Sequence, residues 1–178
     1  MKALKIIAFA GLPLTGKTTL AKLLEGELKI VRLDIDEIRN LLFKHNPVDS
    51  ETDRELDGVQ MWASWKSLFA LADCALEAGD SVIIVGTFSR ETYYKRITSI
   101  AEIRKATLKV VFCHASDEVI AERIEQRKQD KENPSNLRSV EGYHRVKARY
   151  VKMSVPNILN LDTSCSTEKC LSKIKEWI

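Results

Sequence analysis

The chain has 178 residues, of which 44% are hydrophobic, and this is enough apolar side chain for the core of one domain. Its net charge of +3 at pH 7 is too small to indicate nucleic-acid binding by itself. No apolar stretch approaches the length of a membrane span, and the short apolar run near the N-terminus lacks a signal-peptide cleavage site. We therefore expect a single domain over residues 1–178 that is soluble and cytoplasmic and has no membrane partner.

The four cysteines are scattered and have no His or Cys partners at the spacing of a zinc site. Cys74 falls in a helical pattern and Cys113 in an apolar run, so both are expected to be buried core thiols. Reduced thiols are typical of a cytosolic protein.

Short apolar runs alternate with helical patterns along the whole chain. The runs predict strands at Leu4–Ala10, Ile30–Leu33, Ser81–Val85, Leu108–Cys113 and Ile158–Leu161. The patterns predict helices at Lys17–Leu28, Asp36–Lys44, Leu56–Ala78, Arg90–Ile103, Asp117–Lys128, Ser139–Lys152 and Thr167–Trp177. This alternation predicts an α/β fold in which helices cover both faces of a parallel sheet. Such folds bind ligands at the carboxyl ends of the strands.

The segment between the first predicted strand and helix matches the phosphate-binding pattern G-x-x-x-x-G-K-[ST]. Its glycines let backbone N–H groups wrap a phosphate, its lysine places a charge on the β- and γ-phosphates, and Thr18 can ligate Mg²⁺. The helix that follows directs its N-terminus at the same anion. A glycine turn with a surface lysine is the alternative, which the strand–loop–helix context disfavours. We predict an ATP and Mg²⁺ site formed by Gly11, Leu14, Thr15, Gly16, Lys17, Thr18 and Thr19.

Asp36 and Arg39 lie three residues apart at the start of the second predicted helix and so share a face. A carboxylate at the end of a strand can accept the proton of an attacking hydroxyl, and an arginine beside it can bind a phosphate. The alternative is a first-turn aspartate with a surface arginine. The neighbouring phosphate loop favours the catalytic interpretation.

Arg123 and Arg127 lie four residues apart on one helical face, directly before a charged loop. Cations that follow the moving charge and exclude water would serve phosphoryl transfer, so a lid over about 127–138 is expected. A solvated face paired with nearby glutamates is the alternative. The polar loop at Lys44–Leu56 is a second candidate for a mobile cover over the site; the alternative is a disordered surface segment.

Together the phosphate loop, the D-x-x-R pair and the R-x-x-x-R pair resemble P-loop kinases of the polynucleotide kinase, zeta-toxin and chloramphenicol phosphotransferase type. The resemblance implies a P-loop NTPase (nucleoside-monophosphate-kinase-like) three-layer fold with a five-stranded parallel sheet and a short lid. It implies that Lys17 and Asp36 act in catalysis, with Asp36 as general base, and that Arg39 holds the acceptor. Arg123 would lie against the adenine, and Arg127 would stabilise the transferred phosphoryl group. From the residues themselves, Thr18 and Asp36 are the candidates to hold the metal.

The third predicted strand departs from that family, because Gly86 stands where relatives usually have an aspartate that helps to hold Mg²⁺. Asp34 or Asp36 would then have to do so, with Thr87 as a nearby hydroxyl. Arg90 and Arg96 on the next helix could reach the acceptor or be surface charges, and the sequence favours neither.

The acceptor is the least determined part of the prediction. Segment Arg138–Lys152 is basic and carries two tyrosines, so it is either a polynucleotide footprint or, as we favour, an amphipathic helix with a solvated basic side. We expect a kinase acting on a small-molecule hydroxyl or, less favoured, a nucleic-acid 5′-hydroxyl. The alternative is a catalytically weak ATP-binding module. A GTPase switch is disfavoured because no N-K-x-D motif follows the fourth strand.

Overall fold

The computed structural model describes residues 3–43, 54–129, 139–150 and 157–178. Its strands are β1 (Lys5–Ala10), β2 (Val31–Asp34), β3 (Val82–Val85), β4 (Thr107–His114) and β5 (Ile158–Asp162). Its helices are α1 (Lys17–Leu28), α2 (Ile35–Phe43), α3 (Arg54–Glu77), α4 (Glu91–Ile103), α5 (Asp117–Gln129), α6 (Val140–Arg149) and α7 (Thr167–Trp177). Each predicted element is present, with ends that differ by a few residues at most.

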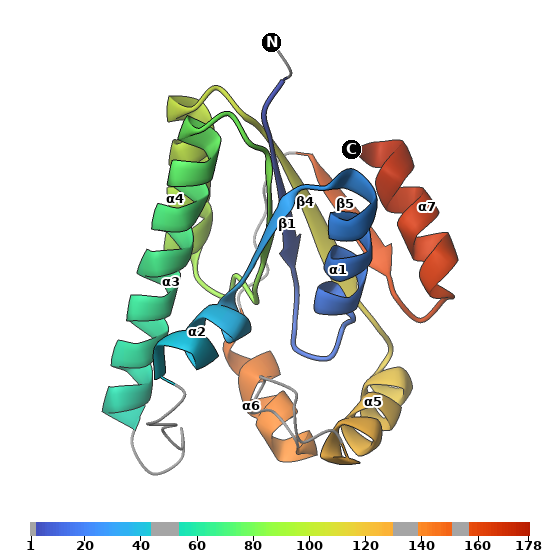
Figure 1. The fold of residues 1–178 in the computed structure, drawn as a ribbon. Helices are drawn as coiled ribbons and strands as arrows, with labels where there is room; N and C mark the ends of the chain where they lie inside the picture. The colour runs from blue at the N-terminus through green and yellow to red at the C-terminus, as the bar shows by residue number, and fades with distance from the viewer. Residues whose placement is uncertain (1–2, 44–53, 130–138, 151–156) are drawn as a thin grey trace.

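The five strands form one parallel sheet in the order β2-β3-β1-β4-β5 (Figure 1). β1 is therefore central, between β3 and β4. The strands end at the lower edge of the sheet in Figure 1, where the phosphate loop follows β1 and α2 follows β2. The strand order thus brings the phosphate loop and the start of α2 to one edge of the sheet, because only β3 lies between β1 and β2.

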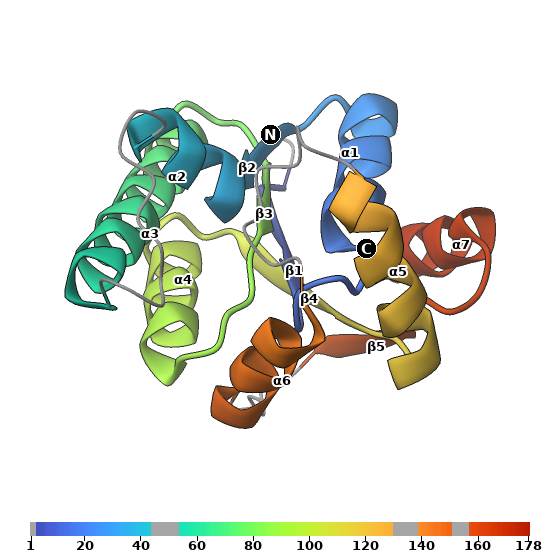
Figure 2. The same cartoon turned by 90° about the horizontal axis from the view of Figure 1, so that it is seen from below.

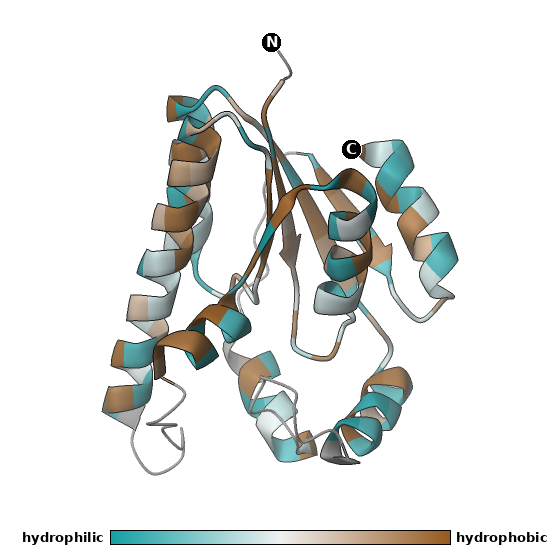
Figure 3. Ribbon diagram, viewed as in Figure 1, coloured by the Kyte–Doolittle hydropathy of each residue, from teal (hydrophilic) through white to brown (hydrophobic). Residues whose placement is uncertain are grey.

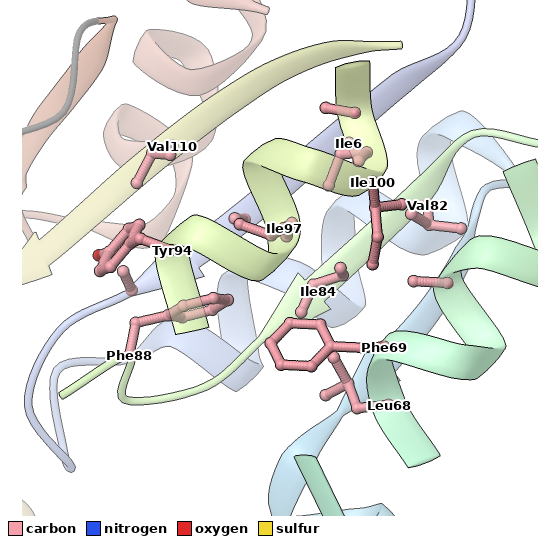
Figure 4. Close-up of a cluster of buried hydrophobic side chains, with 14 of the residues drawn as sticks. Ile6, Leu68, Phe69, Val82, Ile84, Phe88, Tyr94, Ile97, Ile100 and Val110 are labelled. Atoms are coloured by element: carbon pink, nitrogen blue, oxygen red, sulfur yellow. The ribbon is translucent and has the colours of Figure 1, made fainter. Parts of the chain in front are cut away.

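Alternate residues of the strands enter two separate cores, which makes the fold three-layered. Ile6 and Ala8 of β1 face α3 and α4, in a cluster with Leu68 and Ile97 (Figure 4). Ile7 and Phe9 face the opposite way, toward side chains of α1 and α7. Apolar residues accordingly occupy most of the sheet, whereas the helices are amphipathic (Figure 3). Burial on both faces explains why these strands lack strict polar alternation.

α2, α5 and α6 lie near the carboxyl ends of the strands, as the view from below shows (Figure 2). α2 lies on the side of α3, and α5 and α6 lie on the side of β4 and β5. Leu14 of the phosphate loop is buried in a small third cluster with Ile120, Ile124 and Tyr143. The loop is therefore packed against α5 and α6.

The expected burial of the cysteines needs one correction. Cys113 is buried as expected, but Cys74 is exposed. The buried stripe of α3 runs through Trp65, Leu68, Ala72 and Leu76, and residue 74 lies off that stripe, so the prediction for Cys74 was wrong.

The expected lid falls largely outside the described residues, since 130–138 are not described; its first residues, up to Gln129, belong to α5. Most of the polar loop at Lys44–Leu56 lies outside them too. No helix in the described ranges is long and apolar enough to cross a membrane.

Candidate active site

The phosphate loop has a backbone conformation that its glycines make accessible. Gly11 has φ 131°, and a Cβ there would lie 2.2 Å from the carbonyl oxygen of Cys113. Gly16, directly before α1, has φ 74°, which also disfavours other residues. Leu14 has φ 68° and is held by its buried side chain. Turns into the left-handed region orient successive backbone N–H groups toward one point, as anion-binding loops require.

Lys17 is buried within this loop, with only 8% of its surface exposed. Its Nζ donates to the carbonyl oxygen of Leu12 at 2.5 Å and lies 3.4 Å from Thr15 Oγ1. Burial lowers the pKa of Lys17 to about 8, against the opposing effect of the nearby Asp36 and Asp34 carboxylates. In the described part of the chain, this buried ammonium bonds to neutral oxygens, so it would gain free energy from an anion in the loop.

Asp34 connects the phosphate loop to the end of β2. Its Oδ2 accepts a hydrogen bond from Thr18 Oγ1 at 2.9 Å, and its Oδ1 accepts the backbone N–H of Asp36 at 2.9 Å. The carboxylate is 3% exposed. Hydroxyl and carboxylate oxygens are ligands that Mg²⁺ prefers, so Thr18 and Asp34 together fit that metal.

Asp36 lies two residues further along the chain, in the first turn of α2, and lines the same cavity as Lys17. Burial raises the pKa of Asp36, and the neighbouring Asp34 carboxylate raises it further; Lys17, Arg39 and Arg127 oppose this. A carboxylate with a raised pKa is a stronger base than an ordinary aspartate, which suits it to accept a proton from a hydroxyl.

Arg32 lies beside the Asp34 carboxylate and was not anticipated from the sequence. It donates to Glu25 of α1 at 2.9 Å and to Glu37 of α2 at 2.8 Å, and its Nη1 lies 3.6 Å from Asp34 Oδ2. The side chain is 9% exposed. No local sequence pattern predicts the position of Arg32, because its partners come from two different helices.

Arg123 connects the phosphate loop to the turn after β5. Its Nη1 donates to Leu14 O at 2.9 Å and to Thr163 Oγ1 at 3.2 Å, and its Nη2 donates to Thr163 O at 2.8 Å. These bonds fix the guanidinium plane beside Gly16. The expected contact with adenine stays a prediction, but the arginine also has a structural role, because it joins the phosphate loop to Thr163.

The other two predicted arginines differ in position. Arg127 borders the cavity and lies near enough to Lys17 and Asp36 to lower the pKa of both. Arg39 forms an ion pair with Asp57 of α3 and is not among the described residues that line the cavity. Arg39 is close enough to Asp36 to lower its pKa, so the expected proximity of the two residues is compatible with this ion pair, and the role of Arg39 at the acceptor stays a prediction.

One cavity of about 690 Å³ brings most of these residues together. It is lined by the following predicted residues: Leu14, Gly16, Lys17, Thr18, Thr19, Asp36, Arg123 and Arg127. Gly11 and the buried Thr15 belong to the same loop but do not line the cavity. The wall continues to Gly86 and Thr87 on one side and to Thr163 and Cys165 on the other. A volume of this size is in the ordinary range for small-molecule sites.

The structure explains why residue 86 is a glycine. A Cβ on Gly86 would lie 2.6 Å from Trp65 Cη2. The Trp65 ring stacks on Tyr93 at 4.1 Å and meets the edge of Phe88 at 4.9 Å, so it has little room to move. The indole therefore occupies the space that an aspartate at residue 86 would need.

Replacing Gly86 with alanine is expected to lower the free energy of unfolding by about 1–3 kcal/mol, because the added methyl group overlaps the indole of Trp65. Urea denaturation measures this directly. The matched control is Gly58→Ala on α3, where an added Cβ has no neighbour within 4 Å; there we expect a gain of up to about 1 kcal/mol. Equal stability of the two variants would contradict the proposed overlap.

Comparison with known proteins supports this description of the fold. The sequence model of a family described as AAA domain matches residues 6–150. No protein of curated function matches the chain. Similar solved structures include a candidate kinase from Chloroflexus aurantiacus (23% identity, 99% of this chain and 100% of the other, TM-score 0.79).

Two more distant structures bind nucleotides according to their descriptions. The Mycobacterium tuberculosis APS kinase CysC, in complex with AMPPNP and APS, is 17% identical over 99% of this chain and 98% of the other, with TM-score 0.71. Kti12 of Chaetomium thermophilum, in complex with ADP-AlF3, is 17% identical over 97% and 98% respectively, with TM-score 0.66. The fold of this chain is therefore the three-layer fold of P-loop NTPases of the kinase type, as the sequence predicted.

Proposed function

The chain belongs to the AAA domain family, and from that premise we propose that it is an ATP-dependent phosphotransferase that moves the γ-phosphate to a hydroxyl group of an acceptor. One observation carries the proposal: a buried lysine in a phosphate loop and a carboxylate with a raised pKa line the same cavity. Between them, the loop threonine is hydrogen-bonded to a second carboxylate.

The phosphate loop would hold the nucleotide. Backbone N–H groups between Gly11 and Thr18 and the N-terminus of α1 would bind the β-phosphate, as in other glycine-rich loops. Lys17 would exchange its bond to the Leu12 carbonyl for oxygens of the β- and γ-phosphates. The Arg123 side of the cavity, with Thr163 and Cys165, would then take the nucleobase.

The opposite side of the cavity would take the acceptor. Asp36 would orient the acceptor hydroxyl and accept its proton, so that the oxygen can attack the γ-phosphorus. Arg127 would stabilise the charge that develops on the transferred group. Both side chains border the cavity, and the surface near Gly86 and Thr87 lies beyond Asp36, where an acceptor could enter.

Thr18 and Asp34 are our proposed holders of Mg²⁺, in place of the Thr18 and Asp36 pair expected from the sequence. The hydrogen bond from Thr18 to Asp34 shows that their oxygens already converge. Mg²⁺ bound there would neutralise charge on the phosphates. Asp36 is then left free for proton transfer, and no aspartate on β3 is needed.

Asp34→Asn tests this assignment. We expect the Mg²⁺ concentration for half-maximal turnover to rise about 10–100-fold, because an amide is a weaker ligand than a carboxylate for this metal. Nucleotide binding without metal should be retained. The control is Asp80→Asn, which changes an exposed residue. An unchanged Mg²⁺ dependence would return the metal to Asp36, as the sequence suggested.

An acceptor panel tests the proposed activity itself. ADP release from ATP and Mg²⁺ is measured with sugars, other small alcohols and an oligonucleotide with a 5′-hydroxyl, each against no acceptor. A rise with one class, accompanied by a phosphorylated product, supports the transferase. ATP binding without stimulation by any acceptor would favour the ATP-binding module.

A further inference from the structure

Two cysteines beside the cavity approach each other closely. Cys165 Sγ and Cys170 Sγ are 3.2 Å apart, and both sulfurs are near the carbonyl oxygen of Asp162, at 3.4 and 3.6 Å. Cys165 is exposed, in the turn between β5 and α7, whereas Cys170 is buried in the first turns of α7. From the sequence, Cys165 and Cys170 were considered only as zinc ligands and rejected as such, so their approach to each other was missed.

The pair is connected to the nucleotide side of the cavity. Both cysteines line the cavity, as does Thr163 two residues before Cys165. Thr163 accepts two hydrogen bonds from Arg123, which in turn donates to Leu14 of the phosphate loop. A shift of the β5–α7 turn would therefore reach the loop through a single arginine.

We propose that Cys165 and Cys170 form a redox modification site, in which a peroxide oxidises them to an internal disulfide that weakens nucleotide binding. The consequence for nucleotide binding rests on the proposed function of the cavity. Formation of the disulfide does not. The sulfurs need to approach by only about 1.2 Å to reach bonding distance.

The reaction balances with hydrogen peroxide as the two-electron oxidant. The exposed Cys165 thiol loses its proton, and the thiolate attacks a peroxide oxygen. The O–O bond breaks to give a sulfenic acid and hydroxide, and the released proton converts the hydroxide to water. The Cys170 sulfur then attacks the Cys165 sulfur, the S–S bond forms, and the S–O bond breaks to release a second water. Two thiols and one peroxide thus give one disulfide and two waters.

The burial of Cys170 affects the rate of the second step. Burial raises the pKa of Cys170 to about 11, with a further increase from its contact with Cys165. At neutral pH little of Cys170 is thiolate, and the fraction increases as the pH rises. The disulfide is therefore expected to form faster at pH 9 than at pH 7.

Nucleotide binding and disulfide formation affect each other by the same factor. Cys170 is fixed in the core with Leu171 and Ile174, so closing the pair must move the Cys165 turn, and with it Thr163. If the disulfide weakens nucleotide affinity by a given factor, a bound nucleotide disfavours the disulfide by the same factor. We expect a factor of about five or more.

The first measurement is whether the disulfide forms. The full chain is treated with hydrogen peroxide and digested without reduction, and a peptide pair joined through Cys165 and Cys170, lighter by two hydrogen atoms, is sought by mass spectrometry. Cys165→Ser should abolish it and Cys74→Ser, at the exposed cysteine of α3, should not. Sulfenic or sulfinic acid at Cys165 of the otherwise native chain, without the crosslink, would overturn the proposal.

The second measurement is the coupling to nucleotide. Affinity for a fluorescent ATP analogue is compared before and after oxidation, within the native chain and within Cys165→Ser. A reversible loss of about fivefold in the native chain alone, restored by a thiol reductant, supports the proposal. Equal affinity in the oxidised and reduced native chain would overturn the regulatory part. If the reduced chain binds no ATP analogue, the proposed function fails instead, and the crosslink is still observable.

Discussion

Lys17→Ala is expected to lower kcat/KM for ATP by about a thousandfold, because it removes the buried cation next to the transferred phosphate. Among the described residues, the side chain bonds within its own loop, to Leu12 and Thr15, so the fold should survive its loss. Turnover and ATP affinity are measured together, and circular dichroism monitors folding. The control is Lys95→Ala, an exposed lysine paired with Glu91 on α4.

The pH dependence of binding gives the same residue a second readout. Because burial lowers the pKa of Lys17 to about 8, this side chain loses its positive charge in the nucleotide-free protein as the pH rises above that value. Phosphate binding must then recruit a proton, and ATP affinity should fall by up to tenfold per pH unit above about pH 8. Below that pH the lysine is charged and contributes no slope. The slope should be absent from Lys17→Ala, and its persistence there would assign it to another group.

Asp36→Asn is expected to lower acceptor-dependent turnover by about 10²–10⁴-fold while ATP affinity changes little. The amide keeps the shape of the side chain but cannot accept the hydroxyl proton. Product formation with the stimulating acceptor measures the loss, and Asp80→Asn is again the control. If acceptor-dependent turnover survives in Asp36→Asn, Asp36 is not the base, and the transferase mechanism described above is wrong.

The unmodified chain provides an independent check on Asp36. Burial and Asp34 raise the pKa of Asp36, so its carboxylate is protonated at a higher pH than that of an ordinary aspartate. A protonated acid cannot accept the hydroxyl proton, and turnover should therefore fall as the pH falls through that raised pKa. ATP binding measured over the same range separates this effect from loss of nucleotide.

The phosphate loop and its surroundings show what local pattern predicts well. Gly11, Gly16 and Lys17 were identified because the loop depends on residue types at fixed spacing, and the structure gives both glycines positive φ. The alternation of strands and helices was likewise readable, since apolar runs and helical stripes reflect burial of each element separately. Asp36 was placed at the cavity correctly, because the carboxyl ends of parallel strands meet at one edge.

Local sequence patterns could not predict contacts between elements that are distant in the sequence. The sequence could not show that Trp65 fills the space at Gly86, that Arg39 turns to Asp57, or that Arg32 is held by two helices. It left open which aspartate meets Thr18, and the structure selects Asp34. The Cys165–Cys170 approach depends on how a turn enters α7.

The sequence by itself determined the fold class, the phosphate loop and a carboxylate at the end of β2, because each depends on periodicity or on neighbouring residues. Only the tertiary structure decided the strand order, the partner of each charged side chain and the shape of the cavity. Those depend on which side chains from separate elements pack into the same space, and no local pattern encodes that.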